Sequence, residues 1–141
     1  MLIGSSLKKG SCEIETKNLD GETNTKEKFP NKKVYPLVST EKDAVRNLNG
    51  SLIECEAPNE FLYTFNGNFT VPSLNGGKPM PIDAESILLR GSSLTEADFI
   101  YGVAVYTGHE TKIMKNSTGA RAKKSDVERK TDKYIILLVL I

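Results

Sequence analysis

The residues in this sequence that are best suited to carry out a chemical reaction form the short run Asp20-Gly21-Glu22-Thr23. The run lies between two segments that are typical of strands, Cys12–Thr16 and Thr25–Lys28. Gly21 allows the backbone to bend tightly and to approach another surface closely, because glycine has no side chain and adopts left-handed conformations readily. A carboxylate at the tip of such a turn, Glu22, can act on chemistry housed outside its own domain. In an ordinary Asp-Gly hairpin, by contrast, a neighbouring glutamate is simply solvated.

The elements around this turn are expected to be mainly β. Short apolar or aromatic segments alternate with Gly, Pro and Asn turns, a pattern that favours a small β-sandwich or distorted jelly roll. Asn66-Gly67 is a strong hairpin signal. The other segments expected as strands are Ser51–Glu56, Phe61–Phe65, Asn68–Val71, Ile87–Arg90 and Ile100–Tyr106.

One short amphipathic helix is expected over Glu41–Leu48, where Ala44, Val45 and Leu48 share a face. Thr40 or Ser39 can cap its start, and Asn49-Gly50 can end it. In the next segment Phe61, Tyr63 and Phe65 would share one face of a strand. We interpret this face as core or inter-sheet packing, because no basic residues interleave with the aromatics to make a nucleic-acid platform.

The C-terminal end has a different character. Ser125-Asp126-Val127-Glu128 matches a capping box, which predicts a helix that runs on into the unbroken apolar segment Tyr134–Ile141. Eight apolar residues are too few to cross a bilayer, which takes about 20. Basic residues precede the segment, as they do on the cytoplasmic side of membrane spans. We therefore expect a truncated membrane span, the alternative being a C-terminal strand or a buried helix end.

Composition narrows the function classes. The chain has 141 residues and a formal net charge of +1, so its length fits one domain and its charge implies no strong attraction to nucleic acid. The two cysteines, Cys12 and Cys55, are too few for a disulfide framework, which favours a reduced, cytosolic setting. The single histidine, His109, follows a strand end and is expected in a turn or at the surface; with no second imidazole, a metal site is not expected.

Several motifs occur in one order along the chain, and together they carry a family resemblance. They are Cys12–Lys26, Gly50–Asn59, Leu62–Gly67, Ile87–Leu94, Ile100–Asn116 and Lys123–Lys130. From about Gly10 to its end, the sequence resembles the actuator domain of type IV P-type ATPases, the phospholipid flippases. Cation-pumping relatives usually carry T-G-E-S at the turn, whereas D-G-E-T, found here from Asp20 to Thr23, is the flippase form.

This resemblance implies a fold and a division of the chain. The family's actuator domain is a β-rich, distorted jelly roll on the cytosolic side of a membrane protein, inserted between the second and third membrane helices. On this basis residues 1–9 would be an N-terminal connector and 10–122 the actuator β domain. Residues 123–141 would form the basic-flanked helix that enters the start of the third membrane helix.

The resemblance also implies a function for the turn. In the parent pump, Glu22 would place and polarise the water that hydrolyses an aspartyl phosphate, and Gly21 would allow close approach. Asp20 and Thr23 would shape the loop, and Asn24 would assist them. The phosphorylated D-K-T-G-T motif is absent from this sequence. The chain would therefore be an inactive fragment of an enzyme whose ATP and Mg²⁺ bind elsewhere.

The implied partners are the phosphorylation domain of the same pump, a membrane phospholipid as transported substrate and an accessory glycoprotein subunit, with no nucleic acid. Two other function classes stay open on the sequence alone. One is a stand-alone cytosolic β-sandwich module that presents the turn to a partner protein. The other is a secreted domain glycosylated at sequons such as Asn68-Phe69-Thr70. A downstream D-K-T-G-T motif would favour the pump.

Overall fold

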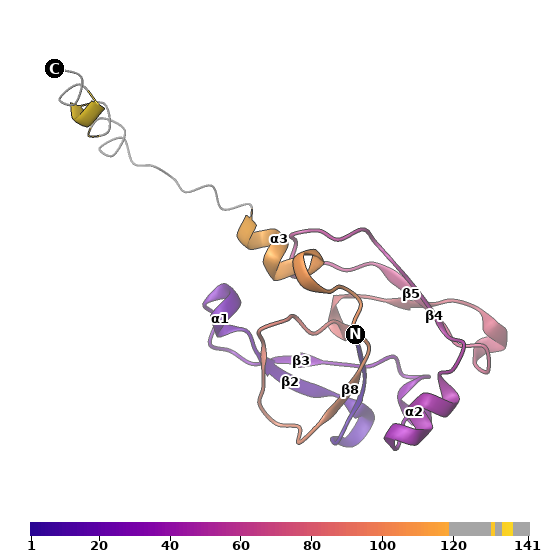
Figure 1. The fold of residues 1–141 in the computed structure, drawn as a ribbon. Helices are drawn as coiled ribbons and strands as arrows, with labels where there is room; N and C mark the ends of the chain where they lie inside the picture. Colours follow the sequence, from indigo (N-terminus) through magenta and orange to yellow (C-terminus); the bar gives the residue numbers. More distant parts are fainter. Residues whose placement is uncertain (119–130, 132–133, 137–141) are drawn as a thin grey trace.

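The computed structural model describes residues 1–118, 131 and 134–136. In this part of the chain the protein is mainly β, with short strands, long connections and few helices (Figure 1). The strands are β1 Leu2–Ser5, β2 Cys12–Glu15, β3 Lys26–Lys28, β4 Leu52–Cys55, β5 Gly67–Thr70, β6 Met80–Ile82, β7 Ser93–Leu94 and β8 Ile100–Gly102.

The described strands form three small antiparallel sheets. Their orders are β1-β8, β3-β2-β7 and β4-β5-β6. In the sheet that carries the turn, Cys12 pairs with Lys28 and Ile14 with Lys26, while β2 pairs with β7 on its other side. The prediction of two strands flanking the turn is therefore confirmed.

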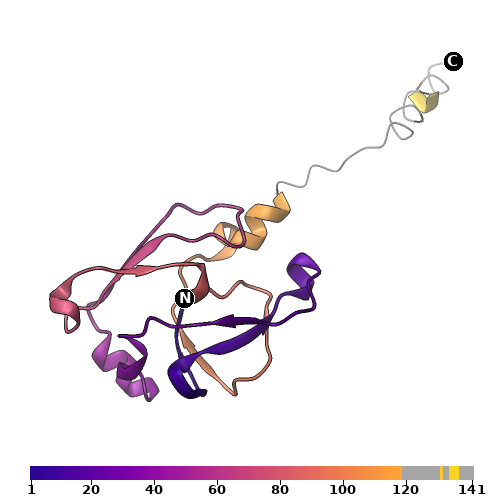
Figure 2. The same ribbon diagram turned by 180° about the vertical axis from the view of Figure 1, so that it is seen from behind.

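Three α-helices lie within residues 1–118, and residues 131 and 134–136 are also helical. The three helices are α1 Lys17–Asp20, α2 Glu41–Asn47 and α3 Lys112–Thr118. Seen from the front and from behind, α1 and α2 lie at opposite sides of the β body, and α3 leads away from it (Figures 1 and 2). Single turns of 3-10 helix occur at Lys8–Gly10, Tyr35–Leu37, Asn75–Gly77, Ala84–Ser86 and Gly108–Glu110.

Helix α2 confirms the capping prediction. The Thr40 hydroxyl oxygen accepts a hydrogen bond from the backbone N–H of Asp43 at 3.2 Å, and Gly50 adopts a positive φ just after the helix. Ala44 and Leu48 pack against the core as expected, but Val45 is 72% exposed. The apolar face of this short helix is thus narrower than its sequence suggests.

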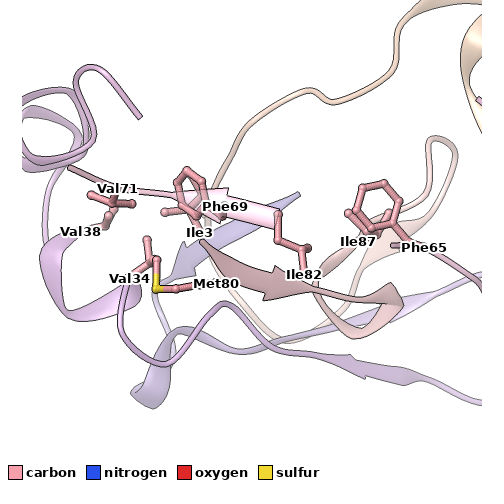
Figure 3. Close-up of a cluster of buried hydrophobic side chains, with 9 residues drawn as sticks. All are labelled: Ile3, Val34, Val38, Phe65, Phe69, Val71, Met80, Ile82 and Ile87. Carbon is pink, nitrogen blue, oxygen red and sulfur yellow. The ribbon is translucent and has the colours of Figure 1, made fainter. Parts of the chain in front are cut away.

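The core has two parts, and the first strand contributes to both. Ile3 belongs to the larger cluster, whereas its neighbour Leu2 packs with Cys12 and Ile14. Adjacent strand residues point to opposite faces, so β1 places one side chain in each cluster. The larger cluster comprises Ile3, Val34, Val38, Phe65, Phe69, Val71, Met80, Ile82 and Ile87 (Figure 3).

The strand predicted at Phe61–Phe65 is wrong. This segment is part of the irregular connection between β4 and β5, which pair directly with Leu52 opposite Thr70. Phe65 is buried, whereas Phe61 and Tyr63 are exposed, so the three rings do not share a face. Aromatic residues favour strands mainly because they pack well on sheets, and here the neighbouring strands pair without them.

The hairpin turn predicted at Asn66-Gly67 is also wrong. Gly67 begins β5, and an added Cβ there would lie 2.8 Å from the carbonyl oxygen of Glu54. This glycine therefore permits close strand pairing, not a two-residue turn. The pairing extends beyond the strands, because the N–H of Glu56 donates to the carbonyl of Asn66 at 3.0 Å.

Two apolar segments are less regular than predicted. Ile87–Arg90 is not a strand, although Ile87 packs in the larger cluster from an irregular segment. Only Ile100–Gly102 of the predicted Ile100–Tyr106 strand is regular, and it pairs with β1. An apolar run marks burial, but strand geometry also needs a partner with free backbone groups.

The two ends of the chain can be compared with the expected division into a connector, an actuator β domain and a membrane-entering helix. Strand β1 lies within the expected 1–9 connector, pairs with β8 and contributes to the core. The boundaries at 9/10 and 122/123 stay predictions, and the helix expected from Ser125 lies outside the described residues. Of the apolar segment expected to enter the membrane, Tyr134, Ile135 and Ile136 are helical and exposed. Within the described part of the chain, every helix falls short of the length and apolar character that a membrane crossing needs.

Candidate functional site

The turn between β2 and β3 is built by the single helical turn α1. The N–H of Gly21 donates to the carbonyl of Lys17 at 2.9 Å and closes this turn. Gly21 has a φ of 77°, the left-handed conformation in which helices commonly end on glycine. Gly21 thus has the left-handed conformation that glycine adopts readily, although it ends a helical turn and does not form a two-residue hairpin.

A second glycine holds α1 against the body of the protein. Gly91 has a φ of 92°, and a Cβ added there would lie 3.1 Å from Cδ2 of Leu19. The missing side chain of Gly91 therefore makes room for Leu19, the apolar residue of α1. Leu19 thus packs α1 against the segment around Gly91.

The carboxylate of Asp20 organises the backbone that follows it. Its Oδ1 accepts a hydrogen bond from the N–H of Glu22 at 2.9 Å, and its Oδ2 accepts one from the hydroxyl of Thr16 at 2.9 Å. Thr16 is buried. Aspartate commonly shapes turns in this way, by binding the backbone two residues ahead.

Lys26, at the start of β3, joins both carboxylates. Its Nζ lies 2.7 Å from Oδ2 of Asp20 and 2.8 Å from Oε2 of Glu22. The side chains of Lys26 and Asp20 are 24% and 11% exposed, whereas that of Glu22 is 55% exposed. Asp20 is therefore a largely enclosed structural carboxylate, and Glu22 is the carboxylate presented to the surroundings.

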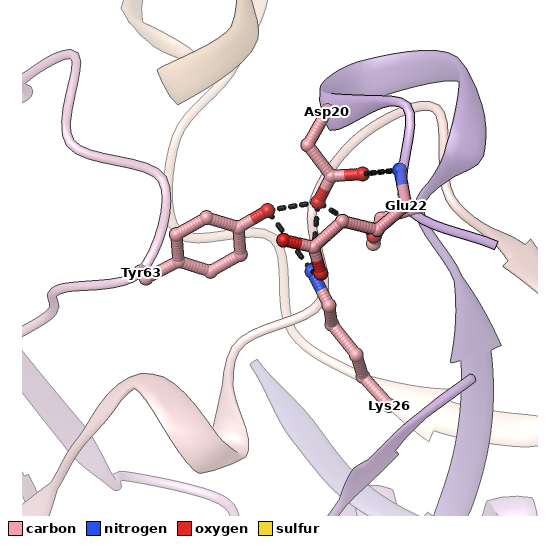
Figure 4. A network of polar contacts seen from close by, with 5 residues as sticks. Asp20, Glu22, Lys26 and Tyr63 are labelled. Atoms are coloured by element: carbon pink, nitrogen blue, oxygen red, sulfur yellow. Dashed lines mark hydrogen bonds and ion pairs between the residues drawn. The ribbon is translucent and has the colours of Figure 1, made fainter. Parts of the chain in front are cut away.

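Tyr63 completes this arrangement from a distant part of the chain. Its hydroxyl donates to Oδ2 of Asp20 and accepts a hydrogen bond from Nζ of Lys26 at 3.0 Å (Figure 4). The ammonium of Lys26 also lies 4.3 Å from the centre of the Tyr63 ring, in cation–π contact. We refer to Asp20, Glu22, Lys26 and Tyr63 as the turn cluster.

The charges of the turn cluster are set by these contacts. Hydrogen bonds from Lys26 and then from Tyr63 hold the pKa of Asp20 well below its ordinary value. Burial lowers the pKa of Lys26, but its bonds to Asp20, Glu22 and Tyr63 together outweigh this and raise the pKa. Burial and the bond to Asp20 raise the pKa of Tyr63. At neutral pH, Asp20 and Lys26 are thus firmly charged and the Tyr63 hydroxyl remains a donor.

The other residues predicted for the site lie at the exposed tip of the turn, but Thr23 does not bond the loop as expected. Gly21, Thr23 and Asn24 are exposed at the tip beside Glu22. The Thr23 side chain makes no hydrogen bond to the described residues, so Asp20 is the predicted residue that shapes the loop here. His109 is exposed in the turn after β8, as expected, and both cysteines are free.

Sequence reasoning missed Lys26 and Tyr63. The spacing of Lys26 four residues after Glu22, at the start of the return strand, is a signal that could have indicated an ion pair. Tyr63 carries no comparable signal, because it lies 43 residues from Asp20 in an irregular segment.

The arrangement suits presentation of a carboxylate to an external partner. A hydrogen-bonded backbone turn places Glu22 at its tip, and apart from the chain neighbours of Gly21 no atom lies within 4 Å of the position where its side chain would begin. The described residues contain no group of three or more His, Cys, Asp or Glu side chains that could hold a metal ion.

Comparison with known proteins identifies relatives of the whole chain, although no protein-family model matches it. It is 44% identical over 146 residues, covering 100% of this chain, to probable phospholipid-transporting ATPase 7 of Arabidopsis thaliana. It is 44% identical over 137 residues (96% of the chain) to phospholipid-transporting ATPase 6 and 42% identical over 141 residues (100%) to probable phospholipid-transporting ATPase 4 of the same plant. These matches cover 10–11% of the relatives' lengths. Over its whole length, the chain is therefore homologous to a segment of plant phospholipid-transporting ATPases, which are type IV P-type ATPases, and spans about a tenth of their length.

Proposed function

We propose that this chain is the actuator segment of an ATP-dependent phospholipid pump, and that its Asp20–Thr23 turn drives hydrolysis of the pump's aspartyl phosphate. The proposal is supported by homology to phospholipid-transporting ATPases over the whole chain. The single observation that carries the assignment of the site is the position of Glu22. Its carboxylate is more than half exposed at the tip of a turn whose backbone is held by Asp20 and Gly21.

In this mechanism, the turn docks against a phosphorylated aspartate in another domain of the pump. Glu22 accepts a hydrogen bond from a water molecule and aims its oxygen at phosphorus. The new bond forms between the water oxygen and phosphorus, while the bond from phosphorus to the aspartate oxygen breaks. The aspartate carboxylate is regenerated, inorganic phosphate leaves, and the water proton passes to Glu22 or to the phosphate. Catalysis of this kind depends mainly on positioning and charge.

The other turn residues have supporting roles. Gly21 keeps the tip free of a side chain, so that the backbone can come close to the phosphate. Asp20 sets the direction of the backbone at Glu22 through the hydrogen bond to its N–H. Thr23 and Asn24 lie exposed next to Glu22, where they can contact the docking surface.

The wider assignment follows from the same proposal. The β body would be the family's distorted jelly roll, on the cytosolic side of a membrane protein, and residues beyond α3 would lead into the third membrane helix. ATP and Mg²⁺ would bind other parts of the pump. The partners would be its phosphorylation domain, a transported phospholipid and an accessory glycoprotein subunit.

The test is Glu22→Gln in the full-length pump that contains this segment. The variant should form the phosphoenzyme from ATP normally but lose it at least about 100-fold more slowly, because an amide cannot accept the water proton. Glu27→Gln is the matched control, since Glu27 is an exposed glutamate on β3. Rapid decay of the Glu22→Gln phosphoenzyme would remove the assignment of Glu22.

A further inference from the structure

The turn cluster contains one member that does not belong to the β2–β3 hairpin. Tyr63 lies 37 residues beyond Lys26, in the connection between β4 and β5, and its hydroxyl contacts both Asp20 and Lys26. The Asp20 Oδ2 atom thereby receives bonds from Thr16, Lys26 and Tyr63, while Oδ1 holds the N–H of Glu22. One of the bonds that fix the Asp20 carboxylate therefore comes from the irregular connection between β4 and β5, outside the hairpin that carries Glu22.

The segment that carries Tyr63 is itself held in place at its base. The Lys112 side chain is only 3% exposed, and its Nζ lies 2.6 Å from Oδ1 of Asn59 and 3.3 Å from Oε1 of Glu56. The hydroxyl of Tyr106 donates to the carbonyl of Glu56 at 2.7 Å. Lys112 is the first residue of α3, so these bonds connect the Tyr63 segment to that helix.

We propose that Tyr63 and Lys26 are positioning residues for Glu22, and that Tyr63 holds the hydrolytic turn to the β4–β5 connection. This inference rests on the proposed function. Tyr63 acts through Asp20 and Lys26: its hydroxyl orients the Asp20 carboxylate, which in turn holds the N–H of Glu22. Lys26 neutralises Asp20 and keeps the Glu22 carboxylate close to the turn until it docks.

The alternative is that Tyr63 merely covers the surface. Its ring is half exposed, so replacing it with phenylalanine leaves the packing and the cation–π contact in place and removes only the hydroxyl. A surface role predicts no effect of this change. A positioning role predicts slower hydrolysis, because a misplacement of about 1 Å at a reacting group can cost about 100-fold in rate.

The experiment measures the two partial reactions of the full-length pump separately: formation of the phosphoenzyme from ATP, and its decay after an ATP chase. Tyr63→Phe should form phosphoenzyme at the parental rate and lose it about 10-fold more slowly. A variant that was only less well folded would give less phosphoenzyme with a normal decay rate. Tyr35→Phe is the matched control, because it removes a phenol hydroxyl that makes no hydrogen bond within the described residues.

Lys26 provides a second, independent comparison. Lys26→Met should slow decay at least as much as Tyr63→Phe, because it removes the bonds to both carboxylates. Lys26→Arg should decay faster than Lys26→Met, since a guanidinium keeps the charge and offers several donors to the same oxygens, although its planar shape differs from that of the ammonium. Failure of the arginine variant to improve on methionine would contradict a positioning role for Lys26.

The outcomes separate this inference from the proposed function. If Glu22→Gln traps the phosphoenzyme but Tyr63→Phe decays at the parental rate, the positioning role is overturned and the function of Glu22 stands. If Tyr35→Phe slows decay as much as Tyr63→Phe, the positioning role is likewise overturned. If Glu22→Gln decays rapidly, the proposed function fails first, and the inference fails with it.

Discussion

Replacing Gly21 with alanine tests the geometry of the turn most directly. Gly21 has a φ of 77° and closes α1, and a Cβ built on it meets no atom within 4 Å. Any destabilisation by alanine must therefore come from backbone conformation and not from a steric clash. The hydrogen bond from its N–H to the carbonyl of Lys17 can remain in the variant.

The size of the effect follows from two opposing contributions. An L-residue in the left-handed region costs about 1–2 kcal/mol. Alanine also lowers the conformational entropy of the unfolded chain, which raises the free energy of unfolding by about 0.4–1 kcal/mol. We expect the free energy of unfolding to fall by about 1 kcal/mol, and the melting temperature by about 3–5 °C for a chain of this size. Gly21→Asn should cost less than Gly21→Ala, because asparagine tolerates this conformation better.

Urea and thermal unfolding of the 141-residue chain, followed by circular dichroism, measure these differences. Gly77→Ala is the matched control, with a φ of 71° and an equally open Cβ position, and it should cost the same. Gly91→Ala should cost more, because its Cβ would also meet Leu19 at 3.1 Å. A Gly21→Ala protein as stable as the parent would refute the left-handed turn. In the full-length pump, only the change at Gly21 should slow phosphoenzyme decay, since Gly77 lies on another loop.

Three further predictions concern the core, the acid side of the pH profile and a helix cap. Phe69→Ala should lower the free energy of unfolding by about 3–5 kcal/mol, because Phe69 is buried in the larger cluster, whereas exposed Phe61→Ala should change it by less than about 0.5 kcal/mol in urea titrations. The pKa of folded Asp20 lies below its ordinary value of 3.8, so its contribution to stability is present above that pH and is lost as the pH falls below it. The urea midpoint of Asp20→Asn should therefore fall less steeply than that of the parent between about pH 5 and pH 2, and equal slopes would contradict the contacts of Asp20. Thr40→Ala should cost about 1 kcal/mol through loss of the cap on Asp43, and Ser39→Ala, which removes no such cap, should be close to neutral in the same assay.

Much of the local structure could be predicted because it depends on neighbours in the chain. The two strands around the turn, the left-handed glycine and the Thr40 cap of α2 all involve residues within a few positions of one another. Their preferences are carried by residue type: Gly21 for its conformation, and Thr40 for its hydroxyl. The exposed position of Glu22 follows from the same local pattern.

The errors occur where a segment's structure depends on a distant partner. Phe61–Phe65 has the composition of a strand, yet β4 and β5 pair with each other and leave it as a connection. Ile87 is buried as its apolar character predicts, but no strand forms at Ile87–Arg90. The 1–9 connector stays a prediction, but strand β1, which lies within it, shows the same dependence on a distant partner: it pairs with β8 and places side chains in both parts of the core.

The turn cluster also combines local contacts, which the sequence predicts, with long-range contacts, which it does not. Residue types close together in the chain suffice to present one carboxylate on a glycine-ended turn, because hydrogen bonds such as that from the Glu22 N–H to Asp20 span only two residues. Tyr63 reaches Asp20 and Lys26 only in the assembled fold. It lies 43 residues from Asp20 and 37 residues from Lys26 in the chain. Contacts across such a separation are selected by the packing of the whole molecule, because short-range conformational preferences do not extend that far.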